Sequence, residues 1–269
     1  MKGQLAQRLN TLYLDFVMDN HLDTNFEPVI VEGSTRQGPW LLTCDHASNA
    51  VPPFVNNGCL GLPHEDMNRH IAYDVGAAGV TSHLAKLLDA PAVMSTFSRL
   101  VIDPNRGEDD PTLIMQLYDG TIIPGNRDHT TDMRSQRLDR LHRPYHQTVS
   151  DLAHQRPANS IYLAIHSFTP QLSGRPPRPW QIGVLYAHDR RVADPLMHRL
   201  RQEPDLHVGD NQPYNGALRG DATDRHALQH DRLNVLIELR NDLIETETDQ
   251  VAWAERLAPI LEETRLGLL

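Results

Sequence analysis

The sequence predicts an α/β fold in which a mostly parallel sheet is covered by helices on both faces. Apolar runs of strand length alternate with segments of helical periodicity along most of the 269 residues, as in doubly covered parallel sheets. No Gly/Ser linker, low-complexity tract or fixed-period repeat divides the chain. We therefore expect a single domain over residues 1–269.

The predicted elements follow from local patterns. A peripheral amphipathic helix is expected over residues 1–22, and the proline-rich segment 173–180 is expected to be a rigid loop. Short apolar runs predict buried strands, and longer periodic segments predict helices. The expected strands are 39–44, 91–97, 99–103, 159–168 and 232–240, and the expected helices are 65–89, 132–155, 190–203 and one from about 249.

The composition limits the partners that the protein is expected to bind and the compartment in which it is expected. The 35 acidic and 25 basic residues give a formal net charge of −10, which opposes binding to nucleic acid or anionic lipid. The N-terminus lacks the order of a signal peptide, and no run of about 18 apolar residues could span a membrane. Cys44 and Cys59 are too few for a disulfide framework, so both are expected to be reduced and packed. We expect a cytoplasmic protein, and the sequence leaves open whether it forms a homo-oligomer.

Three predicted strands carry ionisable side chains at or near their ends. His46 follows the strand 39–44, His166 lies in 159–168, and Glu238 lies in 232–240. In open α/β sheets the ligand site lies beyond the carboxyl ends of the strands. Because imidazole is a common zinc ligand, we expect His46 and His166 to hold a divalent metal, with zinc the preferred ion.

A hydrolytic zinc site needs a third protein ligand and an open position for water. Asp66, His70 and Asp74 are spaced four residues apart, which would place them on one face of the predicted helix 65–89. Any of the three could face the metal. We take Asp66 as the leading candidate and His70 and Asp74 as alternatives.

Glu238 is flanked by aliphatic residues, where an unpaired carboxylate would cost several kcal/mol to bury. The functional interpretation is a general base whose pKa is tuned by burial and a nearby cation. The structural interpretation is a strand residue that bonds to Arg240 or another arginine.

Two loops supply further candidates. Asn105 and Arg106 offer an amide and a planar guanidinium, which suit a substrate carboxylate, although a solvated Asp-Pro-Asn turn has the same composition. Arg225 or Arg99 could stabilise an oxyanion. His226 could orient the substrate or bind the metal, although a helix cap at residues 223–224 explains this loop equally well.

Other catalytic motifs are missing from the sequence. It contains no GxSxG elbow, no GxxxxGK[ST] phosphate loop, no HExxH and no GxGxxG after a strand. Ser48 and Ser167 each follow a key histidine, but nothing places a free base beside either. A serine hydrolase is therefore a minor alternative.

Six segments in the same order resemble the N-formylglutamate amidohydrolase (deformylase) family. They are "DHASNAVP", "RHIAYDVGA", "SRLVIDPNR", "AIHSFTP", "RPWQIGVLY" and "DRHA…IELRNDLI", and the match runs from about residue 40 to 245. The resemblance implies the phosphorylase/hydrolase-like α/β fold shared with zinc carboxypeptidases. It also implies hydrolysis of a linear carbon–nitrogen amide bond with a divalent metal.

The more distant resemblance to zinc carboxypeptidases implies roles for several residues. His46 and His166 resemble their metal histidines, Asn105–Arg106 resembles their substrate-carboxylate pair, and Glu238 corresponds to their general base. One departure is Asn49, which stands where their H-x-x-E motif has the carboxylate ligand, so Asp66, His70 or Asp74 would replace it.

A second departure concerns the substrate. Ser48 stands where the closer deformylase pattern has glycine, and "DMNRH" stands where that pattern has "DTDWH". These differences indicate a divergent branch whose acyl group and amino acid are open, and they make Ser48 a candidate substrate contact.

The sequence thus predicts a zinc-type amidohydrolase that acts on a small N-acyl amino acid related to N-formylglutamate. The alternative is a binding protein that keeps the carboxylate pocket and has lost the metal, an interpretation that Asn49 supports.

Overall fold

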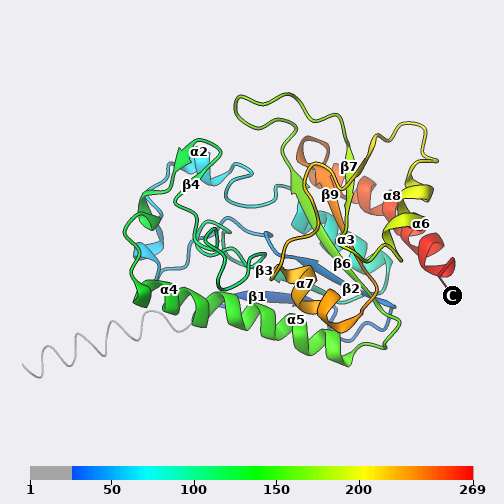
Figure 1. Ribbon diagram of the computed structural model, residues 1–269, viewed down its shortest axis with the longest axis horizontal. Coiled ribbons are helices and arrows are strands. Elements are labelled where there is room, and N and C mark those ends of the chain that lie inside the picture. The colour runs from blue at the N-terminus through cyan, green and yellow to red at the C-terminus, as the bar shows by residue number, and fades with distance from the viewer. Residues whose placement is uncertain (1–25, 269) are drawn as a thin grey trace, which may run out of the picture.

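The computed structural model describes residues 26–268, and Figure 1 shows how its helices and strands are arranged. The predicted helix over residues 1–22 lies outside this part of the chain. Within it, the main sheet has seven strands in the order β1-β3-β2-β6-β9-β7-β8. The strands are β1 Val29–Glu32, β2 Trp40–Cys44, β3 Ala92–Ser95, β6 Ile161–Phe168, β7 Ile182–Leu185, β8 Val208–Asp210 and β9 Asn234–Arg240.

The sheet is mixed but mostly parallel, which confirms the predicted fold class. Strands β3, β2, β6 and β9 run parallel through its middle. β7 and β8 are parallel to each other, and β7 is antiparallel to β9, as β1 is to β3. Every residue of β2 and β6 is buried, as expected for parallel strands that are covered on both faces.

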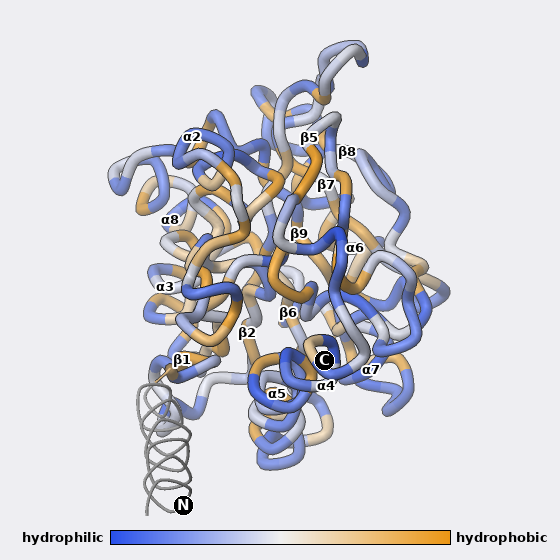
Figure 2. Tube along the Cα trace, turned by 90° about the vertical axis from the view of Figure 1, so that its left-hand side faces the viewer, coloured by the Kyte–Doolittle hydropathy of each residue, from blue (hydrophilic) through white to orange (hydrophobic). Residues whose placement is uncertain are grey.

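Helices cover both faces of this sheet. On one face, α3 Ala77–Leu87, α6 Ala193–Leu200 and α8 Glu247–Leu266 pack over Leu42 and Leu163. On the other face, α5 Arg143–Gln155 packs over Leu41 and Tyr162. Because successive strand residues point to opposite faces, these adjacent apolar residues build two separate cores. In Figure 2 the hydrophobic stretches, in orange, gather on the central strands, while the outer loops are mainly hydrophilic.

The shorter elements surround the ends of the sheet. They include a second, two-stranded sheet formed by a hairpin. These elements are α2 His64–Met67, β4 Leu117–Tyr118, β5 Thr121–Ile122, α4 Thr131–Arg137, the π-helical turn Leu138–His142, α7 Ala222–His226 and the 3₁₀ turns Asn56–Gly58, Pro124–Asn126, Leu228–His230 and Asn241–Leu243.

The predicted helix 65–89 is wrong as a continuous element. The chain instead forms the short α2, then turns, and enters α3 only at Ala77. Gly76 precedes α3 with a φ of +79°, a left-handed conformation that interrupts any helix. Asp66, His70 and Asp74 therefore do not share a helical face, because only Asp66 lies in a helix.

Two further expectations are corrected. Residues 99–103 form a turn and not a strand, because their apolar side chains pack into a separate core with Phe97 and Ile71. Cys59 is exposed and not packed, whereas Cys44 is buried as expected. Strands β1, β7 and β8, of three or four residues each, were not predicted.

The register of the central strands brings the predicted site residues together. His46 lies two residues after the end of β2, and β2 lies beside β6, which carries His166. His166 is paired with Glu238 across β6 and β9. The fold thus places all three residues at one edge of the sheet.

We predict that Gly76→Ala destabilises the protein far more than Gly120→Ala. Both glycines have nearly the same φ, +79° and +78°, so alanine should cost about 1–2 kcal/mol at each. At Gly76 a Cβ would also lie 2.1 Å from the carbonyl oxygen of Ile244, whereas nothing lies within 4 Å at Gly120. That overlap should add about 1–3 kcal/mol, measured as the difference in free energy of unfolding in urea. Equal losses for the two variants would contradict the close packing of Gly76 on Ile244.

Candidate functional site

A cavity of about 360 Å³ opens at the edge of the sheet where β2 and β6 end. Its wall combines acidic, basic and aromatic side chains with an aliphatic patch. The lining residues are His46, His70, Asp74, Arg99, Asn105, Arg106, Tyr118, His166, Ser167, Phe168, Thr169, Leu185, Tyr214, Asn215, Gly216, Ala217, Leu218, Asp221, Leu236 and Glu238.

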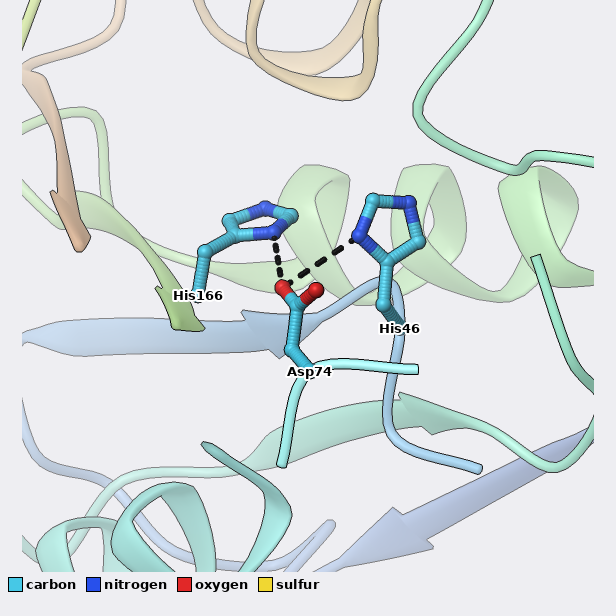
Figure 3. Close-up of side chains that lie close together, drawn as sticks. All are labelled: His46, Asp74 and His166. Atoms are coloured by element: carbon cyan, nitrogen blue, oxygen red, sulfur yellow. Dashed lines mark hydrogen bonds and ion pairs between the residues drawn. The ribbon is translucent and has the colours of Figure 1, made fainter. Parts of the chain in front are cut away.

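His46, Asp74 and His166 converge on one point of this cavity (Figure 3). The Oδ2 atom of Asp74 lies 2.8 Å from Nδ1 of His166 and 3.3 Å from Nδ1 of His46. All three side chains are buried, and one ligand atom from each lies within 4.8 Å of the others. Two imidazoles and a carboxylate are a donor set that suits zinc.

Backbone contacts hold Asp74 in this position. Its N–H donates to the carbonyl oxygen of His46 at 2.9 Å, and the N–H of Ser167 donates to its Oδ2 at 3.3 Å. The turn before α3 is thereby fixed to the ends of β2 and β6.

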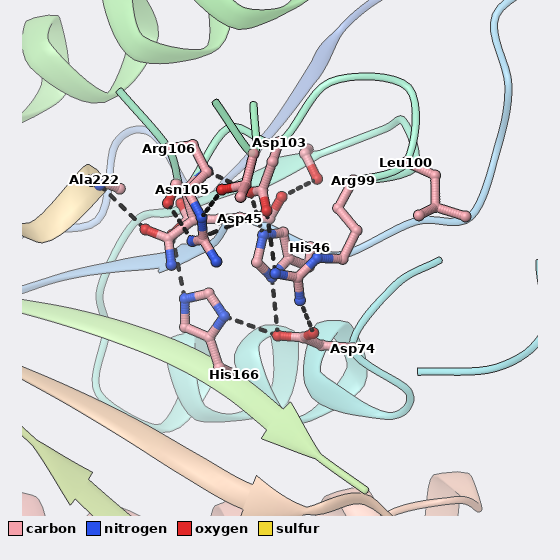
Figure 4. A network of polar contacts seen from close by, with 12 residues as sticks. Asp45, His46, Asp74, Arg99, Leu100, Asp103, Asn105, Arg106, His166 and Ala222 are labelled. Carbon is pink, nitrogen blue, oxygen red and sulfur yellow. Dashed lines mark hydrogen bonds and ion pairs between the residues drawn. The ribbon is translucent and has the colours of Figure 1, made fainter. Parts of the chain in front are cut away.

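The outer nitrogen of each histidine faces a second buried carboxylate (Figure 4). Nε2 of His46 lies 2.7 Å from Oδ1 of Asp103, and Nε2 of His166 lies 3.2 Å from Oδ2 of Asp45. The hydroxyl of Tyr145 donates to the other oxygen of Asp45. Carboxylates in this position accept the Nε2–H and leave the lone pair of Nδ1 pointing inward. Two inward lone pairs next to Asp74 require a cation between them, either a proton or a metal ion.

The electrostatics agree with this requirement. Burial opposes the charge of Asp74, but His46 and His166 hold the pKa of its carboxyl below the ordinary value. Burial likewise opposes the charge of Asp103, while His46 and Arg99 hold its pKa well below the ordinary value. Burial would lower the pKa of His166, but Asp45 and Asp74 raise it well above the ordinary value. The cluster therefore stabilises positive charge strongly.

Glu238 is a buried acid of this site whose Oε2 has no hydrogen-bonded partner within residues 26–268. Only 6% of the residue is exposed, and Oε2 makes no hydrogen bond within residues 26–268. Burial, with the charge of Asp74, raises the pKa of Glu238 to about 8. Arg240, the partner in the structural interpretation, instead pairs with Asp242 at 2.8 Å. Glu238 is thus a carboxyl that can gain or lose a proton near neutral pH.

Two arginines bring positive charge to the cavity. Arg99 lies 3.4 Å from Asp74 and 3.1 Å from Asp103, and its guanidinium lies over the ring of Tyr118. Arg106 is held by the hydroxyl of Thr112 and by a carbonyl oxygen, with its nearest carboxylate oxygen 3.9 Å away. Arg106 is therefore less fully paired than Arg99.

The rim of the cavity is tied together by the β4–β5 hairpin. Asp119, in its turn, lies 3.4 Å from both Arg69 and His70. Its other oxygen accepts a hydrogen bond from the N–H of Ser173, in the predicted proline-rich loop, at 3.0 Å. One carboxylate thus joins segments that precede α3 and follow β6.

Comparison with known proteins identifies the relationship. A family model described as N-formylglutamate amidohydrolase matches residues 38–245, most of the chain. The chain belongs to the N-formylglutamate amidohydrolase family. The resemblance seen in the sequence is thereby confirmed. No curated protein sequence matched the chain.

Two solved structures are similar to this amidohydrolase-family chain. The gene product Atu2144 from Agrobacterium tumefaciens is 35% identical, with a TM-score of 0.85 over 90% of this chain and 96% of that one. The N-formylglutamate amidohydrolase from Ralstonia eutropha JMP134 is 22% identical, with a TM-score of 0.70 over 90% of this chain and 100% of that one. The likeness to the Ralstonia eutropha structure supports a shared fold.

Within this family member, the structure brings most of the predicted site residues to the cavity. His46, His166, Glu238 and Arg99 line it, and so do Asn105 and Arg106. Asp74, one of the alternatives, occupies the position expected of the third metal ligand. No described helix combines the length and apolar character that crossing a lipid bilayer requires.

Four predicted residues lie away from the cavity lining. Asp66 pairs with Arg69 at 2.8 Å, and Ser48 Oγ accepts a hydrogen bond from the N–H of Ala50. His226 is buried against His146, with 2.8 Å between ring nitrogens, and Arg225 is on the same short helix α7. The N-terminal cap of α7 is Asp221, and not one of residues 223–224 as the sequence suggested.

The site also contains residues whose role the sequence did not reveal. Asn49 donates to the carbonyl oxygen of Met67 and lies outside the cavity lining. Asp45 and Asp103 hold the outer faces of the histidines. The only signal for them was position, since Asp45 directly precedes His46 and Asp103 ends the apolar run 99–103.

Proposed function

We propose that the protein hydrolyses the amide bond of an N-acyl amino acid with a divalent metal, zinc by preference, held by His46, His166 and Asp74. One observation carries the proposal. Both imidazoles turn Nδ1 toward the same Asp74 oxygen while a second carboxylate faces each Nε2. A binding pocket for an organic ligand alone has no need of that arrangement, whereas a metal centre uses it to fix the tautomer of its ligands.

The donor set fits the metal by charge as well as by type. Asp45, Asp74 and Asp103 are all buried, and Arg99 is the cation that pairs with two of them. With both histidines neutral, as metal ligands are, these three carboxylates outnumber Arg99 and Arg106, and a divalent cation would offset the remaining negative charge. The chemistry that zinc supplies in such sites is a lowered pKa for water and polarisation of a carbonyl oxygen.

Glu238 would act as the general base. It would accept the proton of the attacking water as the new C–O bond forms, and pass that proton to the amine nitrogen as the C–N bond breaks. Its position beside His166 in the sheet and its pKa of about 8 both support this role. A carboxyl with a pKa near the working pH can both take and return a proton.

The arginines would position the substrate. Arg106 and Asn105 would bind the carboxylate of the amino acid, since a guanidinium and an amide side chain both present donors to the cavity. Arg99, from its place beside Asp74, would stabilise the negative charge that develops on the carbonyl oxygen. Arg99 is preferred to Arg225 for this role because it lines the cavity.

We predict that Asp74→Asn weakens zinc binding by more than about 100-fold, since loss of even an outer partner of a ligand typically costs 10–100-fold. Asp66→Asn is the matched control, because it removes the same charge from a partly exposed ion pair outside the cavity lining. Zinc affinity would be measured by competition with a chelating dye. Equal affinities for the two variants would contradict Asp74 as a ligand. A wild-type protein that binds no zinc would favour the metal-free binding protein.

We predict that Glu238→Gln keeps the fold, the zinc content and the substrate affinity, while kcat falls by about 10²–10⁴-fold. The amide should be tolerated, because Oε2 makes no hydrogen bond within residues 26–268 that the substitution would break. The measurement is kcat together with Tm and metal content. If Tm collapses while kcat per folded molecule stays unchanged, Glu238 is a structural residue.

We predict that Arg106→Ala raises KM by about 10–100-fold for substrates with a free carboxylate, the cost of losing a charged hydrogen bond. Substrates in which that carboxylate is an amide should be much less affected. Arg225→Ala serves as the control, because Arg225 lies outside the cavity lining. Equal losses for acid and amide substrates would assign Arg106 a structural role.

A further inference from the structure

One buried acid of the cavity has no role in the mechanism above. Asp221 is 4% exposed and lines the cavity. Its Oδ1 caps α7 by accepting the N–H of Asp224 at 2.7 Å. Its Oδ2 makes no hydrogen bond to any residue from 26 to 268, so no protein donor binds this oxygen.

The cavity that Asp221 lines also has an aliphatic floor. Leu185 and Leu236 face each other across β7 and β9, and both line the cavity with Ala217 and Leu218. Leu236 precedes Glu238 by two residues on the same face of β9, so the floor begins about 6.6 Å from the proposed base. The side chain of the leaving amino acid is long enough to span this distance of about 6.6 Å.

The carboxylate-binding pair and Asp221 belong to the same wall. The side-chain oxygen of Asn105 accepts the N–H of Ala222, the residue after Asp221, at 3.1 Å. Asn105, Arg106, the aliphatic floor and Asp221 all line the same cavity, so an amino acid whose carboxylate is bound by Asn105 and Arg106 has both the floor and Asp221 available to its side chain. Arg99, another cation of the lining, contacts Asp74 and Asp103.

We propose that the leaving amino acid has a side chain with an aliphatic stem and a cationic tip, like lysine or ornithine, and that Asp221 binds the tip. This inference rests on the proposed function for the orientation of the substrate. The stem would cover Leu185, Leu236 and Leu218, and the ammonium would supply the donor that Oδ2 of Asp221 lacks. A glutamate side chain would instead bring a second carboxylate against Asp221.

The charge state of Asp221 agrees with this assignment. Burial, and to a smaller extent the charges of Asp45 and Asp224, raises its pKa to about 7. A buried carboxylate with a raised pKa lacks a cation, and an ammonium bound beside it would stabilise the ionised form.

The test compares three substrates on the zinc-loaded protein at pH 8, namely the N-formyl derivatives of L-lysine, L-norleucine and L-glutamate. Norleucine is lysine without the ammonium group. We expect kcat/KM for the lysine substrate to exceed that for the other two by about 10-fold or more, the worth of a charged hydrogen bond. Preference for glutamate, or for norleucine over lysine, would overturn the assignment.

The variant Asp221→Asn tests whether Asp221 is responsible for the preference for the lysine substrate. Asparagine caps helices as well as aspartate does, so α7 should persist while the charge is lost. The ratio of lysine to norleucine kcat/KM should fall by about 10-fold, the glutamate substrate should improve, and the norleucine substrate should change little. Asp224→Asn, which removes a neighbouring charge outside the cavity lining, should leave the ratio unchanged. An unchanged ratio in Asp221→Asn would refute the role of this residue.

A binding measurement separates this inference from the proposed function. Free L-lysine, L-norleucine and L-glutamate would be titrated into the zinc-loaded protein by calorimetry. If lysine binds best and loses that advantage in Asp221→Asn, the assignment stands even where no amide is hydrolysed, and only the proposed reaction fails. If the three amino acids bind equally while an amide substrate is hydrolysed, the reaction stands and the assignment to Asp221 fails.

Discussion

The contact between the Asp74 carboxylate and two imidazoles is the interaction on which the rest of the candidate site depends. A single oxygen of Asp74 faces His46, from the end of β2, and His166, from β6. The same carboxylate binds the N–H of Ser167 and lies beside Arg99. Without it, the two strand ends and the turn before α3 would lose their common partner, and Arg99 would lose one of its two ion pairs within residues 26–268.

The buried acids of the cavity differ in how their charge is balanced. Asp103 has Arg99 and His46, and Asp45 has Tyr145 and His166. Asp221 has one backbone N–H, and Oε2 of Glu238 has no hydrogen-bonded partner within residues 26–268. Buried polar groups are normally paired, so the two incompletely paired acids indicate where water and substrate should bind.

The sequence predicted the parts of the site that lie on long buried strands. His46, His166 and Glu238 were recognised because continuous apolar runs around them are a strong local signal. Helical spacing in residues 65–89 was misleading, because Gly76 interrupts the helix and Asp74 reaches the site from a turn. The roles of Asp45, Asp103 and Asp221 depend on contacts between segments far apart in the chain, which local spacing does not encode.

The hairpin turn at Asp119 has a consequence for how the cavity exchanges its contents. Because Asp119 contacts Arg69 and His70 on one side and Ser173 on the other, three loops at the mouth share one anchor. Displacing the hairpin at Asp119 breaks the contacts of both other loops, whereas displacing either of those loops breaks only its own contact with Asp119. Movement of the hairpin should therefore release both neighbouring loops, and its rate should respond to ionic strength, since the contact of Asp119 with Arg69 is between charged groups that salt screens.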